Sequence, residues 1–331
     1  MIRDPRRVRV MAICLVVLAL AYILLWLLVA VFSRARLMNV LQRGGAERPV
    51  LTLGGFPHWV HLRIKDVSTD LPLLGPASME SLDWWIRPWA PWRLYVQALQ
   101  LRAEPAQESW TAESALARCE EWGTTPSCVL DIKSPHLPVE LGQLRSKMIT
   151  ASWTIPRPAP QDHTQIGGKL SLDIDDLVLA LGAGRFSSGL PVPLGRVDMK
   201  ARIMGAPPYP NSAESLALWS QSGGVIEIDQ LRLGQSIMRI DAQGTLTLDA
   251  QLRPQGAFTL RMEQPESLLI LLPISRETRQ ALDKALVEGK EESTEGKISF
   301  TIPLTVQNGL VQAFGMDIAT VPSLALIYTR K

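Results

Sequence analysis

The sequence is poor in the side chains that most often carry out chemistry. It has four histidines and three cysteines among 331 residues, and its formal net charge is only +2. So small a net charge excludes the strongly basic surface by which proteins hold nucleic acid. The chain also lacks the G-x-S-x-G, G-x-x-x-x-G-K-[ST] and H-E-x-x-H motifs of common hydrolases, nucleotide-binding proteins and zinc proteases. We therefore assign no catalytic residue, no cofactor and no metal site.

Two of the histidines, His58 and His61, raise the question of a metal site because they stand three residues apart. A zinc site needs about three convergent protein ligands. On a strand, residues separated by an odd number point to opposite faces, so this pair favours a structural strand over a metal site. Calcium binding by the acidic stretch "DIDD" (173–176) is a second metal hypothesis. We interpret that stretch as the hydrated rim of a strand.

Long apolar runs are also scarce, and only the N-terminus has one. No charged residue lies between Val10 and Phe32. At about 1.5 Å per helical residue, this run crosses a hydrocarbon core of about 30 Å. A cleaved signal peptide is the alternative, but its apolar core is usually about 7–15 residues long. We predict an uncleaved transmembrane anchor at residues 10–32.

The charges around the anchor predict its orientation. Only one acidic residue, Asp4, precedes the anchor. Four arginines precede it: Arg3, Arg6, Arg7 and Arg9. The positive-inside rule therefore places residues 1–9 in the cytoplasm and the residues after about 36 on the other side of the membrane. We predict a juxtamembrane helix and linker at 33–50 and a β-rich domain at 51–331, with a soft internal boundary near 155–165.

Two of the three cysteines, Cys119 and Cys128, flank the turn-rich segment "EEWGTTPS". In the cytosol we would expect two free thiols. In an oxidising compartment a disulfide is favoured, and closing so short a loop contributes about 2–3 kcal/mol. We predict that Cys119 and Cys128 form a structural disulfide, because their spacing is not that of a C-x-x-C redox motif.

Beyond the anchor, the hydrophobic pattern is that of β-structure. Val60, Leu62 and Ile64 alternate with polar residues, which predicts a strand with one buried face. Further alternating stretches indicate more strands, at 169–174, 226–228, 245–252 and 258–262.

Turn and helix signals complete the fold prediction. The sequence predicts turns at 253–256 and at Asn308-Gly309. Helices are expected from about Asn211 and at 277–288. The predicted fold is mainly β with a few helices (α+β): a transmembrane helix followed by a curved antiparallel β-meander or groove packed on helices.

Tryptophan is the most unusual component of the sequence. Ten are present, and four of them fall within "WWIRPWAPW": Trp84, Trp85, Trp89 and Trp92. Indole rings favour membrane interfaces, where an apolar body and an N–H donor are both accommodated. The cluster is a candidate for contact with the outer leaflet or for lining a groove that holds a lipid-like ligand. Ordinary packing at the end of a sheet is the interpretation we favour.

Four segments after the anchor carry a resemblance to a known family. They are "GGFPHWVHLRIKDV", "RPWAPWRLYVQALQL", "GTLTLDAQLRPQGAFTLRM" and "PLTVQNGLVQAFGMDIATVPSL". Over about residues 33–326 the chain resembles DUF2125, an uncharacterised family of alphaproteobacterial envelope proteins that is similar in layout to AsmA-like proteins. The resemblance implies a structural bend at Gly55, Phe56 and Pro57. It also implies a strand beginning at residues 90–91, and hairpin turns at Gly256 and Gly309.

The resemblance also implies a compartment and a function. AsmA-like envelope proteins have anchored β-rich domains whose apolar grooves are associated with lipid handling. Our leading hypothesis is a non-enzymatic protein, anchored in the bacterial inner membrane, with a periplasmic domain that binds phospholipid or a similar ligand in an apolar β-groove. The alternative is an envelope scaffold or assembly factor that binds another protein. A hydrolase or metal-dependent enzyme ranks third, because it requires His58 and His61 to converge.

Overall fold

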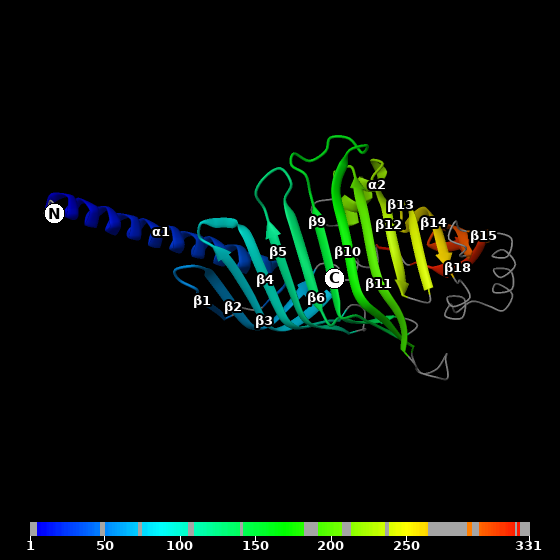
Figure 1. Ribbon diagram of the computed structural model, residues 1–331, viewed down its shortest axis with the longest axis horizontal. Helices are drawn as coiled ribbons and strands as arrows, with labels where there is room; N and C mark the ends of the chain where they lie inside the picture. Colours follow the sequence, from blue (N-terminus) through cyan, green and yellow to red (C-terminus); the bar gives the residue numbers. More distant parts are fainter. Residues whose placement is uncertain are drawn as a thin grey trace. The chain divides into compact units, whose positions relative to one another are not determined.

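Antiparallel β-sheet makes up most of the structure, a computed structural model of the chain (Figure 1). The described residues form two helices and eighteen strands, which confirms the predicted mainly β fold class. They divide into two compact units, Met1–Trp122 and Gly123–Lys331, called unit 1 and unit 2 below. The structure describes residues 5–46, 50–71, 75–104, 109–139, 142–181, 191–206, 213–235, 238–263, 290–292, 298–321 and 323–324.

The division between the units differs from the predicted boundary near 155–165. The proline-rich residues there join two strands that pair with each other, because Thr154 lies opposite Lys169 in an antiparallel ladder. Prolines end the two strands without separating two folding units.

Unit 1 is a helix followed by a five-stranded meander. Each strand pairs antiparallel with the next one along the chain, as neighbouring strands in Figure 1. The elements are α1 (Pro5–Arg43), β1 (Leu51–Gly54), β2 (Val60–Leu71), β3 (Gly75–Arg87), β4 (Ala90–Ala103) and β5 (Trp110–Glu120).

Helix α1 is unbroken, so the predicted anchor and the predicted juxtamembrane helix are one element. Its residues Met11–Arg43 form a stretch that is long and apolar enough to span a membrane. No other helix in the described part of the chain meets this condition. In Figure 1 the N-terminal part of α1 extends beyond the strands of unit 1. The second part packs against β2. Its buried side chains recur at helical spacing: Trp26, Val29, Ala30, Ser33, Leu37 and Leu41.

The buried face of β2 is therefore covered by α1. Val60, Leu62 and Ile64 have no exposed surface, as their alternation predicts. Full burial of one such side chain stabilises a protein by about 1.5–3 kcal/mol. The C-terminal part of α1 thus contributes to the hydrophobic core of unit 1.

The bend predicted at Gly55, Phe56 and Pro57 lies in the turn between β1 and β2. Gly55 has a φ of 89°, in the left-handed region that favours glycine. A Cβ atom at this position would lie 2.6 Å from the carbonyl oxygen of Trp59. Glycine is therefore required here both by the backbone conformation and by the close approach of the chain to itself.

Unit 2 is a longer sheet with one short helix. Its elements are β6 (Ser127–Lys133), β7 (His136–Val139), β8 (Gly142–Arg145), β9 (Met148–Thr154), β10 (Ile166–Leu181), β11 (Pro191–Met204), α2 (Ala213–Gln221), β12 (Val225–Gln235), β13 (Met238–Leu248), β14 (Pro254–Glu263), β15 (Lys290–Glu292), β16 (Ile298–Gln307), β17 (Leu310–Ala313) and β18 (Met316–Thr320).

The strands of unit 2 form one antiparallel series. β9 pairs with β6 on one side and with β10 on the other, and β8 pairs with β7 and with the end of β10. From β10 the ladder continues through β11, β12, β13, β14, β16, β17 and β18, while β15 pairs with β16. The register shifts in β10–β11, β11–β12 and β12–β13. Such bulges bend strands, which accounts for curvature in this sheet.

One predicted turn in unit 2 is confirmed and another is wrong. Asn308 and Gly309 both have positive φ and join β16 to β17 as a two-residue hairpin turn. The turn predicted at 253–256 instead lies at 249–253, because Leu248 and Pro254 form the last pair of β13 and β14. Asp249 causes the earlier reversal, since its Oδ1 accepts hydrogen bonds from the backbone N–H groups of Gln251 and Arg253.

Gly256 is consequently a strand residue and not a turn residue. A Cβ atom there would lie 2.2 Å from the carbonyl oxygen of Thr245, so glycine permits a close backbone approach. The helix predicted near Asn211 is found as α2, which contacts β13. The helix predicted at 277–288 lies outside the described residues.

Candidate functional site

One face of the unit 2 sheet carries three apolar rows that cross eight strands, here called the apolar face. Residues directly opposite each other in a ladder share a face, and so do residues two apart along a strand. The middle row is Leu130, Ala151, Leu172, Met199, Leu231, Ala242, Leu260 and Ile302. One flanking row is Ile132, Ile149, Ile174, Val197, Leu233, Ile240, Met262 and Phe300. The other flanking row is Cys128, Trp153, Leu170, Ala201, Ile228, Gly244, Phe258 and Leu304.

The opposite face of the same strands is polar. One row on this polar face occupies the strand positions that alternate with the middle row and a flanking row. It consists of charged and hydroxyl residues: Asp131, Thr150, Asp173, Asp198, Arg232, Asp241, Arg261 and Thr301. Arg232 Nε lies 3.1 Å from Asp241 Oδ1. The acidic stretch "DIDD" belongs to this face through Asp173, which pairs with Arg196. Asp175 lies 3.9 Å from the same arginine.

Burial along the apolar face is uneven. At β13, β14, β16 and β17 the side chains form a buried cluster: Ile240, Met262, Phe300, Ile302 and Ala313. At β6, β9 and β10 they are only half-buried: Leu130, Ile132, Ile149, Leu172 and Ile174. Aliphatic side chains in a filled core are usually fully buried. The described residues therefore leave part of the apolar face open at β6, β9 and β10.

The four clustered tryptophans of unit 1 do not form one site. Trp84 is buried on the face that carries Leu62, whereas the side chain of Trp85 lies on the other face and stacks on His61 with a centroid distance of 5.1 Å. Trp89 is half-exposed, and Trp92 contacts Trp122 at 5.2 Å. Alternation along β3 separates Trp84 from Trp85.

A pocket of about 330 Å³ lies on the Trp85 side of this sheet. Trp59 and Tyr95 meet edge to face at 5.8 Å, and the guanidinium of Arg87 lies 4.6 Å from the centre of the Trp59 ring. Such walls suit flat or apolar groups. The lining residues are Gly55, Trp59, His61, Trp85, Tyr95 and Leu116.

A buried carboxylate adjoins this pocket. Asp83 is 1% exposed, and its Oδ1 lies 2.6 Å from both His61 Nε2 and Arg63 Nε. Burial acts to raise the pKa of Asp83, but the hydrogen bonds from Arg63 and His61 outweigh it and lower the pKa below its ordinary value. Asp83 is therefore an ionised structural anchor for two neighbouring strands.

The histidines do not converge. His58 lies in the turn after β1, with its ring 6.5 Å from that of Trp89, while His61 faces Asp83 and Trp85. Within the described part of the chain, no three His, Cys, Asp or Glu side chains are grouped to hold a metal ion. Cys119 and Cys128 are both disulfide-bonded, and Cys14 is free.

Comparison with known proteins places the chain in a family. A family model described as "Uncharacterized protein conserved in bacteria (DUF2125)" matches residues 42–322. The chain belongs to this family. Neither the curated proteins nor the solved structures gave a match, so the similarity to AsmA-like proteins stays a prediction.

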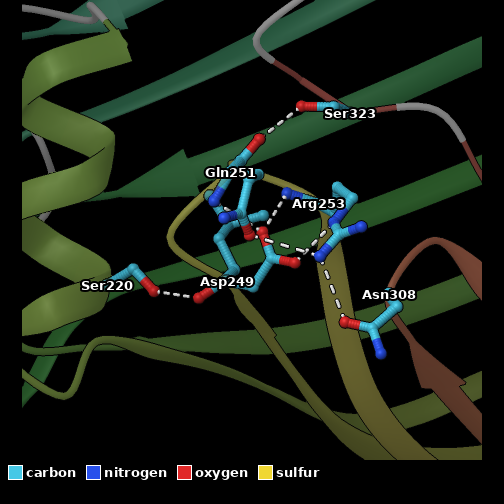
Figure 2. A network of polar contacts seen from close by, with 7 residues as sticks. Ser220, Asp249, Gln251, Arg253, Asn308 and Ser323 are labelled. Carbon is cyan, nitrogen blue, oxygen red and sulfur yellow. Dashed lines mark hydrogen bonds and ion pairs between the residues drawn. The ribbon is translucent and has the colours of Figure 1, made fainter.

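Two of the segments that carry the DUF2125 resemblance meet in a polar network in unit 2 (Figure 2). Arg253 Nε donates to Asp249 Oδ2 at 2.6 Å, and its Nη2 donates to Asn308 Oδ1 at 3.1 Å. Ser323 Oγ closes the network by donating to the backbone oxygen of Gln251 at 2.6 Å. This network joins the β13–β14 turn to the β16–β17 turn, so its contacts assign these family residues a structural role.

Sequence reasoning missed both the Asp83 cluster and the three-row apolar face. His61, Arg63 and Asp83 come from two strands, and no local sequence signal predicts the register that brings them together. The alternating strands of unit 2 each indicated an apolar face. Their alignment into rows depends on eight successive registers, which only the folded chain reveals.

Proposed function

We propose that this DUF2125 protein is a non-enzymatic, membrane-anchored protein of the bacterial cell envelope that binds phospholipid acyl chains on the apolar face of unit 2. The observation that carries the proposal is the set of three in-register apolar rows, half-buried at one end and backed by a polar face. Apolar rows that the rest of the described chain leaves incompletely covered are candidates for an interaction site.

The dimensions of the apolar face suit an acyl chain. The whole face is about 34 Å wide across eight strands about 4.8 Å apart, and its three rows about 6.7 Å apart span about 13 Å; the half-buried strands β6, β9 and β10 make up about 10 Å of that width. The chains of one leaflet fill about half of a 30 Å hydrocarbon core. One chain therefore fits along the face, and each methylene removed from water contributes about 0.8 kcal/mol.

The anchor and the cysteines support the envelope assignment. Helix α1 is long and apolar enough to span a membrane, and the arginines before it favour a cytoplasmic N-terminus. Disulfide-bonded cysteines at 119 and 128 suit an oxidising compartment. Together these features favour a single-pass inner-membrane protein with its main domain in the periplasm.

Site-specific photo-crosslinking in intact cells tests the proposal. A benzoylphenylalanine at Met199 would report on the apolar face, and one at the adjacent exposed Lys200 would report on the polar face as a matched control. We expect phospholipid adducts, identified by mass spectrometry, at position 199 and none at position 200. Intact lipid supports a non-enzymatic role, whereas consistently hydrolysed lipid contradicts it.

Two other outcomes would overturn lipid binding. A discrete protein adduct at position 199 without lipid would favour the scaffold or assembly-factor alternative. No adduct at either position, in protein shown to contain the crosslinker and to be folded, would mean that the apolar face is covered within the chain itself.

A further inference from the structure

The turn between β1 and β2 is fixed to α1 inside the apolar stretch of the helix. The hydroxyl of Tyr22 donates a hydrogen bond to the backbone oxygen of Pro57. Trp26 Nε1 donates to the backbone oxygen of Trp59 at 2.9 Å, and the Trp26 ring meets Phe56 edge to face at 5.4 Å. Tyr22 and Trp26 both lie within the charge-free run that ends at Phe32.

The helix rise places this turn at membrane depth. Trp26 precedes Phe32 by six positions, or about 9 Å of helix. A span of about 20 residues that starts at Val10 ends near Val29. Trp26 then lies about 4.5 Å inside the outer boundary of the hydrocarbon core. Arg9 prevents the span from starting much earlier. Tyr22, which bonds Pro57, lies about 10.5 Å inside the same boundary, so the turn sits between the outer part of the hydrocarbon core and the membrane interface.

A second loop lies at the same edge of the unit 1 sheet. Val60, Ile86 and Leu94 form one transverse row of the ladder, so the turn before β2 and the β3–β4 hairpin lie at the same end. Neither loop contains a charged residue: the two sequences are "GGFPHW" at 54–59 and "PWAPW" at 88–92. Phe56 is 56% exposed and Trp89 is 49% exposed. We call residues 54–59 and 88–92 the aromatic edge.

The opposite edge of the same sheet has a different character. A pocket of about 320 Å³ there is lined by polar and charged residues, among them Ser68, Asp70, Ser78, Arg102 and Glu104. Water-facing loops normally have this composition. At the end near Tyr22 and Trp26 the two loops are apolar, and the acidic residues at the end of the neighbouring strand are paired: Glu120 with Arg93 and Glu121 with Arg36.

The hydrogen bonds from α1 fit an apolar surrounding. Irregular backbone at membrane depth is tolerated only where its polar groups have partners within the protein. The carbonyls of Pro57 and Trp59, which lie in or beside the turn, receive such partners from Tyr22 and Trp26. On α1 itself, apolar side chains at this level are exposed: Leu27, Leu28, Val31 and Phe32.

We infer that the aromatic edge inserts into the interfacial layer of the lipid bilayer, continuous with the exposed side of α1. Phe56 and Trp89 enter the boundary of the hydrocarbon core, while Arg87, stacked on Trp59, and Arg93, paired with Glu120, flank the second loop at the level of the phosphate layer. Unit 1 thus rests on the membrane instead of hanging from a flexible linker. This inference rests on the proposed membrane anchor, but it is independent of lipid binding by unit 2.

Spin-label depth measurements on the full chain test this inference. In a Cys14→Ala background, nitroxides are placed by Phe56→Cys or Trp89→Cys, with Ser78→Cys at the opposite edge as the matched control. The protein is reconstituted into phosphatidylcholine–phosphatidylglycerol vesicles. We expect labels at 56 and 89 to collide more with oxygen than with a water-soluble nickel complex, and the label at 78 to show the reverse.

The free Cys14 of the natural sequence provides the internal reference, because it lies within the proposed span. Suppose that the label at Cys14 lies in the hydrocarbon but the labels at 56 and 89 are as accessible to nickel as the label at 78. This result would overturn membrane insertion of the aromatic edge and leave the anchor standing. A water-exposed label at Cys14 would overturn the anchor itself. If Phe56→Cys disturbs folding, as judged by near-ultraviolet circular dichroism, His58→Cys probes the same turn.

Discussion

At the residue scale, Asp83 shows how a charged group is kept inside a sheet. Its carboxylate is buried, and it accepts hydrogen bonds from Arg63 on the neighbouring strand and, at 3.4 Å, from Ser81. His61 Nε2 and Arg63 Nε each lie 2.6 Å from Asp83 Oδ1. Ionisation would be unfavourable without these partners. The pairing of β2 with β3 brings Arg63 and His61 to this carboxylate, and their hydrogen bonds lower the pKa of Asp83.

Replacing Asp83 with Ala should destabilise the folded protein by about 1–3 kcal/mol at pH 7. Because the folded-state pKa is lowered, this stabilisation is present above the unfolded-state pKa of about 3.9 and is lost as the pH falls through the folded-state value. Urea unfolding measures the free energy of unfolding of the variant and the wild type. The difference between the two should be smaller below about pH 4 than at pH 7. Lys65→Ala, on the same face of the sheet as Asp83, is the control. An equal difference in free energy of unfolding between Asp83→Ala and wild type at both pH values would contradict this account.

At the scale of elements, α1 combines two tasks within one helix. Its first part is exposed and apolar, as a lipid-facing segment is: Met11, Ile13, Leu15 and Leu18 are each 60% exposed or more. Its second part is amphipathic, with Leu37 and Leu41 buried against the sheet and Arg36 bonded to Glu121 at 2.6 Å. The continuous hydrogen-bonded backbone couples the anchor rigidly to unit 1.

Leu37→Ala should therefore cost the folded protein about 2–5 kcal/mol, as expected when a large buried side chain is removed. Val40→Ala, on the exposed side of the same helix at 56% exposure, should change stability by less than about 0.5 kcal/mol. Both variants can be compared with wild type by chemical unfolding of the full chain in detergent micelles, followed by tryptophan fluorescence. Equal effects would show that this part of α1 does not pack on the sheet.

At the scale of the whole molecule, the two units use the same structural principle differently. In unit 1 the apolar side of β2 is buried, and α1 packs against this strand. In unit 2 the apolar face is covered near β14 and β16 but is only half-buried at β6, β9 and β10. An antiparallel sheet with one apolar face needs such a cover. We proposed above that lipid provides it for unit 2.

The topology of the whole chain gives a further prediction. In a Cys14→Ala background, Ser78→Cys should react with a membrane-impermeant maleimide once the outer membrane of living cells is permeabilised, because Ser78 is exposed and unit 1 is proposed to be periplasmic. Ile2→Cys should react only after lysis, since the arginines beside it favour the cytoplasm. The reverse labelling pattern would invert the proposed topology.

Predictions from sequence succeeded where the signal is local. Asn308-Gly309 specifies its own turn because both residues adopt positive φ readily. The turn after Leu248 was misplaced because the side chain of Asp249 competes for backbone N–H groups, and the Pro-Gly pair farther on gave the stronger turn signal. The four clustered tryptophans were considered together as a candidate interface, but strand alternation divides them between buried and exposed positions.

The sequence by itself determined the apolar run of α1, the alternation of the strands and the positions of Gly55 and Asn308-Gly309, because each depends only on neighbours along the chain. The tertiary structure alone decided what covers β2, which residues surround Asp83 and how apolar residues of eight strands align. Those outcomes depend on register and on contacts between distant segments. A shift of one residue in any ladder would turn that strand's apolar side chains to the polar face.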